Sequence, residues 1–322
     1  MRCAYVEAFL FDFNGDGYAL PVLLSWNFSY GFGLPCDAFE ISFIYDPTML
    51  DMLVRANRLR AVFEGETVFF GVVDEFEVSA NERGLTATVR GRGLGALLLD
   101  NEVEAAEYFS ISLDMILDKY VHPLGIREIR KNVSPPTQSM VIRSGASVWR
   151  VLEDFLWFGS GVRPRFDKVG TLLLGNEEGK RLVIDRKTAL SSMVYRNKRH
   201  GVISHVLVKN RVAGTTNLVE NTELLNRGGR AGRVINVPRW TMFDAMRSTG
   251  EYQIERSKDD EFRVSLSFPS LFHVFPGDAI ELSASPLGLY GVYLVTGAQC
   301  FANADRAGTN VTLTRQLSYL EH

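Results

Sequence analysis

The chain has 322 residues, of which 46% are apolar, 11% aromatic and 23% charged. This is the composition of a globular protein of about two domains, and it excludes disordered, collagen-like and low-complexity classes. The net charge of −3 argues against a dedicated nucleic-acid-binding protein, so no specific nucleic-acid site is expected.

The first third of the chain predicts short β-strands. Apolar and polar residues alternate from Phe39 to Tyr45, which is typical of a strand with one buried face. Further strands are expected at 4–13, 62–65, 68–73 and 85–90, with turns at 14–17 and 81–84 and one helical turn at 51–57. Short strands separated by turns favour a sandwich or a barrel, so residues 1–99 are expected to form a first β-barrel domain.

The middle third changes to a helical period. Ser112 is a good N-cap for a helix that ends near Val121, and Ser147 for a helix that ends near Phe158. Strands are expected at 163–166, 171–174 and 182–184. Residues 100–185 therefore predict a small α+β domain.

The last third returns to strands, expected at 202–210, 233–237, 262–268, 279–283, 291–296 and 311–317. The hypothesis is a second β-barrel domain over 186–322, with a helical insertion near 241–257. Residues 213–232 are mostly polar and have no clear period, so an exposed loop is expected there. The fold class is thus mainly β with an α+β insert: two β-barrels that flank a small α+β domain.

A weak internal repeat supports two related barrels. Residues 70–73, 80–84 and 86–90 resemble residues 290–293, 302–308 and 310–315 in order and composition. The spacing from Gly71 to Asn81 is two residues shorter than that from Gly291 to Asn303. The repeat predicts that one barrel has been duplicated.

Charge is distributed unevenly along the chain, with −6 over 1–99, −2 over 100–185 and +5 over 186–322. Residues 186–239 hold eleven Lys or Arg against two Glu, and no aromatic residue lies between Arg196 and Arg239 to stack on bases. We interpret this block as a contact surface for another protein. The candidate contact residues are Arg196, Lys198, Arg199, Arg227, Arg230 and Arg233.

Motifs for catalysis or cofactors are weak. Residues 12–17 copy the first half of an EF-hand loop, but Leu23 stands where the loop needs an acid, so a hairpin turn is the better interpretation. Residues 91–95 alternate glycine without matching a phosphate-binding loop, and turn formation with close packing is expected. No catalytic residue, cofactor or metal site is predicted.

Membrane and export signals are also weak. The uncharged stretches 17–36 and 282–304 are interrupted by Pro, Gly and polar residues, unlike a spanning helix. Three widely spaced cysteines give no disulfide framework. No secretory signal is visible at the N-terminus, so synthesis in a reducing cytoplasm is expected.

Several segments together resemble the hub proteins of phage tail baseplates. The segment 91–102 is the most specific and resembles the passage from the first barrel to the middle domain in the late control protein D and Mu-like hub group, which also occurs in phage-tail-like bacteriocins. The other matching segments are 22–26, 39–43, 63–66, 69–74, 144–152, 275–280 and 290–295. Residues 211–234 match no pattern of the family.

This resemblance implies two barrels like those of tail-tube proteins and a homotrimer that presents six similar units. It implies a hub that joins a sixfold tail tube to a threefold central spike, in a virion tail. The implied partners are the tube or distal tube protein, the spike and, further away, the tape measure and other baseplate proteins. The family has no catalytic residues to transfer.

Two other functions stay open at this point. A carbohydrate- or peptidoglycan-binding β protein would need exposed tryptophans among Trp26, Trp149, Trp157 and Trp240. A cell-wall-degrading tail enzyme would need two carboxylates facing each other across a cleft, and no distinctive pair stands out.

Overall fold

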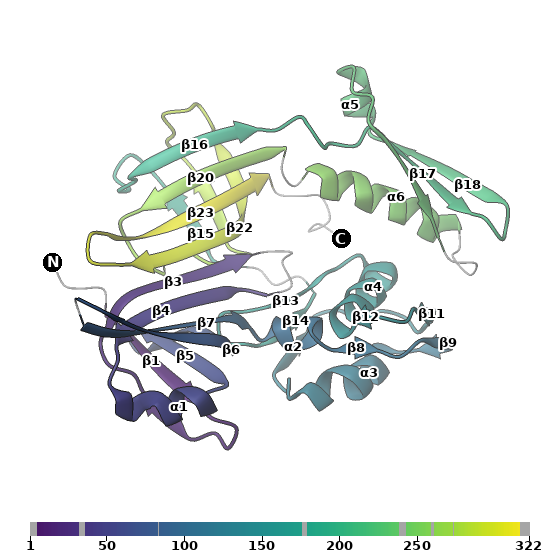
Figure 1. Cartoon of the computed structure of the whole chain (residues 1–322). Helices are drawn as coiled ribbons and strands as arrows, with labels where there is room; N and C mark the ends of the chain where they lie inside the picture. The colour runs from purple at the N-terminus through teal and green to yellow at the C-terminus, as the bar shows by residue number, and fades with distance from the viewer. Residues whose placement is uncertain are drawn as a thin grey trace.

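The structure is a computed structural model that describes residues 5–31, 36–82, 84–175, 179–237, 243–258, 261–272 and 274–315. It is mainly β, with one large sheet and smaller α+β parts on one side of it (Figure 1). This is the fold class predicted from the sequence.

The first barrel is a curled sheet in the order β3-β4-β7-β6-β5-β1-β2. Its strands are β1 (Val6–Phe11), β2 (Gly17–Ala19), β3 (Leu23–Gly31), β4 (Ala38–Ile44), β5 (Arg58–Phe63), β6 (Glu66–Asn81) and β7 (Gly84–Gly93). The 3-10 turn η1 (Pro47–Met49) and α1 (Leu50–Arg55) link β4 to β5. The alternation predicted for β4 is present, with Phe39, Ile41 and Phe43 buried in the core.

Two sequence motifs of this barrel have structural roles. Asp12 accepts hydrogen bonds from the backbone N–H groups of Asn14 and Asp16, which fixes the β1–β2 turn. The expected turn at 91–95 is instead the end of β7 and the start of a helix. The close packing is confirmed, since a Cβ on Gly91 would lie 1.9 Å from the carbonyl oxygen of Val72.

The second barrel has the order β16-β20-β23-β22-β21-β15 around its own core. Its strands are β15 (Arg181–Ile184), β16 (Ser192–Asn197), β20 (Phe262–Phe268), β21 (Ala279–Leu282), β22 (Gly291–Ala302) and β23 (Ala307–Arg315). The sequence placed residues 182–184 in the middle domain. They lie in β15 and pair in parallel with β21, so this strand belongs to the second barrel.

The two barrels repeat one strand order, with one difference in direction: β1 pairs with β5 antiparallel, whereas β15 pairs with β21 in parallel. Taken in chain order, β1, β3, β4, β5, β6 and β7 have the same neighbours as β15, β16, β20, β21, β22 and β23. The barrels then merge into one sheet, because β22 pairs with β3 in antiparallel register from Gly297–Gly31 to Ala302–Trp26. The weak repeat in the sequence therefore corresponds to equivalent hairpins, β6–β7 and β22–β23.

The middle unit is α+β, as predicted. Its helices are α2 (Gly95–Leu99), α3 (Leu113–Ile116), the π-turn η2 (Leu117–Val121), the 3-10 turn η3 (His122–Leu124) and α4 (Val148–Ser160). Its strands are β8 (Glu102–Val103), β9 (Ala106–Ile111), β10 (Ile129–Lys131), β11 (Gln138–Ile142), β12 (Ala146–Ser147), β13 (Pro164–Phe166) and β14 (Leu172–Leu174). Ser112 and Ser147 cap α3 and α4, and Gly161 ends α4 in a left-handed conformation.

A fourth unit lies within the last third. It contains β17 (His205–Asn210), β18 (Thr215–Glu220), α5 (Thr222–Asn226), β19 (Gly232–Asn236) and α6 (Phe243–Lys258), with the sheet order β18-β17-β19. The expectation of an exposed loop over 213–232 is wrong. The insertion is larger than the single helix predicted near 241–257, because α6 packs on this sheet and shares a core with it (Figure 1).

An aromatic side chain ties the last third of the chain to the first barrel. Phe272 lies in the core of the first barrel, with its ring centroid 5.2 Å from Trp26, 5.1 Å from Phe63 and 6.1 Å from Phe28. It is 9% exposed although it precedes β21 of the second barrel. The two barrels therefore share side-chain packing as well as a sheet.

We expect Phe272→Ala to lower the free energy of unfolding by about 3 kcal/mol or more, because the lost ring leaves a cavity among aromatic neighbours. Phe13→Ala is the matched control, since Phe13 is 91% exposed, and it should change stability by less than about 0.5 kcal/mol. Urea denaturation of both variants measures the difference. Equal effects of the two substitutions would contradict the shared core.

Asp37 lies where the first barrel meets the middle unit. Its Oδ1 accepts a hydrogen bond from the Gly31 N–H at 3.0 Å. Desolvation raises the pKa of this carboxyl group to about 7, while the Gly31 bond and Arg165 act in the opposite direction and Asp167 adds to the rise. At a pH between 3.8 and about 7, the carboxyl group is therefore protonated in the folded state, whereas in the unfolded chain, with a pKa of 3.8, it has lost its proton.

Because the folded pKa of Asp37 is raised, its contribution to stability is complete below about pH 4 and is lost as the pH rises towards 7. We expect Asp37→Asn to be more stable than the natural chain at pH 8, with a gap that grows by up to about 1.4 kcal/mol per pH unit between 4 and 7. Denaturation curves from pH 4.5 to 8 test this. Asp16→Asn, at an exposed position, is the control. Parallel pH profiles for natural and Asp37→Asn chains would refute the assignment.

Candidate functional site

The candidate site is the face of the large sheet that points away from both barrel cores, here called the polar face. It runs over eight neighbouring strands, in the order β16-β20-β23-β22-β3-β4-β7-β6. Strand alternation places apolar residues such as Phe28 and Val311 in the cores and leaves polar residues on the other side. The polar face therefore crosses the boundary between the barrels without interruption.

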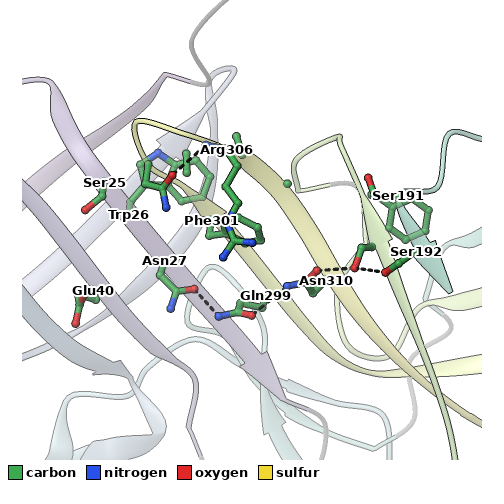
Figure 2. Close-up of a pocket in the computed structure, with 16 residues that line it drawn as sticks. Ser25, Trp26, Asn27, Glu40, Ser191, Ser192, Gln299, Phe301, Arg306 and Asn310 are labelled. Carbon is green, nitrogen blue, oxygen red and sulfur yellow. Dashed lines mark hydrogen bonds between the residues drawn. The ribbon is translucent and has the colours of Figure 1, made fainter. Parts of the chain in front are cut away.

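A chain of side-chain hydrogen bonds crosses five of these strands (Figure 2). Gln299 donates to Asn27 at 3.1 Å and accepts from Asn310 at 3.3 Å. Ser267 donates to Asn310 at 2.9 Å and accepts from Ser192 at 3.0 Å. Each of these groups has a partner, so the row is fixed in place without apolar packing.

The row continues through ion pairs in the first barrel. Glu40 is the neighbour of Asn27 in register, and its carboxylate lies 2.6 Å from the guanidinium of Arg90. Glu75 and Glu77 lie 3.0 and 3.6 Å from the same guanidinium. The hydrogen bonds that Arg90 donates to Glu40 and Glu75 raise the pKa of its guanidinium. One guanidinium thus forms ion pairs with three carboxylates, which leaves an excess of negative charge beside β6.

A shallow hollow of about 590 Å³ lies over the junction of the barrels. Ser25, Asn27, Gln299 and Asn310 line it, together with Arg306, whose guanidinium lies 5.2 Å from the centre of the Phe301 ring (Figure 2). Its lining offers hydrogen-bond donors and acceptors, and Glu40, the acid among the lining residues, is already paired with Arg90. This chemistry suits a wet contact surface.

The two ends of the polar face are strand edges of opposite charge. At one end, residues 75–81 of β6 extend beyond β5 and pair only with β7 among the described strands. At the other end, β16 pairs with β20, and Arg196 lies directly opposite Arg263. Like charges on opposite positions of neighbouring strands are unfavourable unless an acid lies nearby. Glu75 and Glu77 thus lie at the β6 edge and Arg196 at the β16 edge, so the two edges carry side chains of opposite charge.

The structure brings only part of the predicted basic set together. Arg196 lies on β16, and Lys198 and Arg199 follow it, all exposed. The backbone N–H of Lys198 donates to Glu261, whose carboxylate lies 3.5 Å from the guanidinium of Arg227. These residues, which surround the end of β16, form one group.

The remaining two residues are held within the fourth unit. Arg230 donates to the carbonyl oxygens of Leu225 and Gly229, and Arg233 donates to Gln253 of α6 at 3.0 Å. Arg227 also pairs with Glu223 on its own helix. The contact role predicted for the six residues stays a proposal, but their surroundings separate a group at the β16 edge from a group of exposed residues that bond within the fourth unit.

Sequence reasoning missed the polar row. The available signal was the polar residue at every second position, as in Asn27 with Ser29 and Glu40 with Ser42. Within the described residues no group of three His, Cys, Asp or Glu side chains could hold a metal ion. The helices of the described part include none that is long and apolar enough to cross a membrane.

Comparison with known proteins separates sequence from fold. Neither models of protein families nor curated proteins give a match to this sequence. Among solved structures, a tail protein from Neisseria meningitidis is similar with a TM-score of 0.78 at 15% identity, over 97% of each chain.

Two further solved structures agree. The 43 kDa tail protein of prophage MuSo2 from Shewanella oneidensis gives a TM-score of 0.73 at 17% identity, over 96% of this chain and 98% of that one. A component of the Escherichia coli type VI secretion system, described as similar to T4 tail proteins gp27 and gp5, gives 0.60 at 14% identity, over 92% and 74%. The chain therefore has the fold of phage and prophage tail proteins, as its resemblance to baseplate hubs implied.

Proposed function

We propose that this protein is a structural component of a phage or phage-like tail, the baseplate hub that joins a sixfold tail tube to a threefold central spike. The observation that carries the proposal is the repeated strand order of the two barrels, which merge into one sheet through β22 and β3. Likeness to tail proteins over almost the whole chain supports it.

The repeat addresses a mismatch of symmetry. A threefold spike offers three equivalent surfaces and a sixfold tube offers six. Three copies of a chain with two equivalent barrels present six similar units on one side and three identical chains on the other. A closed ring of this kind uses heterologous contacts, in which each copy joins one patch to a different patch on the next. We therefore propose a homotrimer.

The polar face suits the inner wall of such a ring. Its row of bonded side chains from Ser192 to Asn27 keeps hydrogen-bonded polar groups at the surface. We propose tube or distal tube, spike and tape measure proteins as further partners. The proposed location is the baseplate of the virion tail, after synthesis in the bacterial cytoplasm.

The alternatives have less support. Carbohydrate binding needs exposed tryptophans, but Trp26 and Trp149 are 4% and 6% exposed, and Trp157 packs against Tyr252 with ring centroids 4.1 Å apart. Trp240 lies outside the described residues. A wall-degrading enzyme needs two carboxylates across a cleft, and the hollow of the polar face offers Glu40 paired with Arg90. We propose a non-enzymatic protein.

We expect reconstructions of intact tails to contain three copies of this chain, between the tube and the spike. Deleting its gene should leave tails without an attached spike, while a plasmid copy should restore them. Cryo-electron microscopy of both samples gives the copy number and position. A copy number of one or six, or a place in the sheath, would exclude the hub function.

We also expect the purified protein to leave bacterial cell wall intact in a zymogram, because its structural role requires no bond cleavage. Lysozyme serves as the positive control on the same gel. A lysis band that persists through purification and disappears in Glu40→Gln would show enzymatic activity and overturn the non-enzymatic proposal.

A further inference from the structure

The junction inside the chain predicts the junction between chains. In the order of the repeated topology, β22 is the fifth strand of the second barrel and β3 is the second strand of the first barrel. The fifth strand of the first barrel is β6, which corresponds to β22. The second strand of the second barrel is β16, which corresponds to β3. Within the described chain these two strands have free edges, at opposite ends of the polar face.

Two β-bulges fix which residues correspond. The register of β6 on β7 shifts between Val73 and Glu75, and that of β22 on β23 shifts between Val295 and Gly297. Glu75 therefore corresponds to Gly297. This alignment keeps Asn81 with Asn303, as the sequence repeat does, but it matches Gly71 with Tyr293 where the sequence suggested Gly291.

The second strands align through their neighbours. Ile41 of β4 and Leu266 of β20 occupy the same position, since their partners Val89 and Val311 lie opposite Phe76 and Ala298. Trp26 then corresponds to Met193, because these residues pair with Ile41 and Leu266. By the same count, Gly31 corresponds to Lys198 and Ser29 to Arg196.

We propose that β6 of one copy pairs in antiparallel register with β16 of the next copy, as β22 pairs with β3. The transferred register places Glu75 opposite Lys198 and Glu77 opposite Arg196, and it places Ser79 opposite Val194. This inference rests on the proposed ring of three copies and specifies the contact that closes it.

Charge supports this register independently of the topology. Glu40, Glu75 and Glu77 share Arg90, so the β6 edge has more carboxylates than cations. On the β16 edge, Arg196 lies beside Arg263. The register places Glu77 opposite Arg196 on the polar face, where opposite charges on facing positions are favourable.

Exposed apolar side chains support it on the opposite face. Val78 is 38% exposed and Tyr195 is 41% exposed, and the same register makes them opposite neighbours. On the polar face, Val194, which is 56% exposed and would lie opposite Ser79, would also be covered by the arriving strand. A strand edge with exposed apolar residues is otherwise a site of uncontrolled pairing, so a specific neighbour accounts for it.

Disulfide trapping tests the register in the full chain, with Cys3 and Cys36 replaced by serine. We expect Ser79→Cys with Val194→Cys, or Val78→Cys with Tyr195→Cys, to give covalent products up to the trimer on oxidation. Both pairs are needed because neighbouring positions alternate between hydrogen-bonded and non-hydrogen-bonded geometry. Ser79→Cys with Arg196→Cys, displaced by two residues, is the control. Failure of both pairs, or equal yield from the control, would overturn the proposal.

Charge exchange gives a second test by light scattering at low salt, where the protomer has 36.1 kDa. We expect Glu77→Arg or Arg196→Glu to weaken trimer formation about tenfold, and the double variant to restore it. Melting temperatures should stay unchanged, because both residues are exposed. If the double variant remains monomeric, the register is wrong. If tails contain three copies of the chain but the cysteine pairs do not cross-link, this contact is refuted and the hub function stands. If the cysteine pairs cross-link into trimers but tails do not contain the chain, the hub function alone is refuted.

Discussion

The pairing of β22 with β3 is the interaction on which the rest of the structure depends. Backbone hydrogen bonds from Gly297 to Ala302 hold the two barrels in one register. Because side chains alternate along every strand, a common register means that both barrels turn their apolar residues to the same side. Two cores and one uninterrupted polar face follow from this single contact. A slip of one residue would turn one strand over relative to the other, and would place either Phe28 or Cys300 on the polar face.

The sequence predicted most of the fold because its local signals agree with the tertiary structure. Phe39, Ile41 and Phe43 alternate with polar residues, and Ser112 and Ser147 cap their helices as expected. The failures have a physical cause. β18 is an edge strand in which only alternate residues are half-buried, and its unit gains a core from Met246 and Ile254 of α6, far along the chain. The local sequence pattern around β18 does not show this packing, because the residues that cover the strand lie far along the chain.

The candidate site was less accessible to sequence reasoning. The basic block was visible as a count of charges, but its surroundings depend on contacts across the fold. Arg227 reaches Glu261, whereas Arg230 and Arg233 bond within their own unit, and nothing in their spacing distinguishes them. The bond between Gln299 and Asn27 joins residues 272 positions apart. Only the register of the complete sheet brings such groups together.

The distribution of charge on the polar face has a physical logic. At the junction inside the chain, the polar residues that bond across the two strands are the neutral amides Gln299 and Asn27. At the two free edges, the corresponding region carries Glu75 and Glu77 on one side and Arg196 and Lys198 on the other. Covalent connection already keeps the two barrels of one chain near each other, so charge adds little there. Separate molecules must find each other by diffusion, and opposite charges accelerate that encounter and disfavour pairing of like edges. In the proposed ring, charged residues would therefore lie where the sheet of one copy meets the next copy, and neutral amides lie where the two barrels of one chain join.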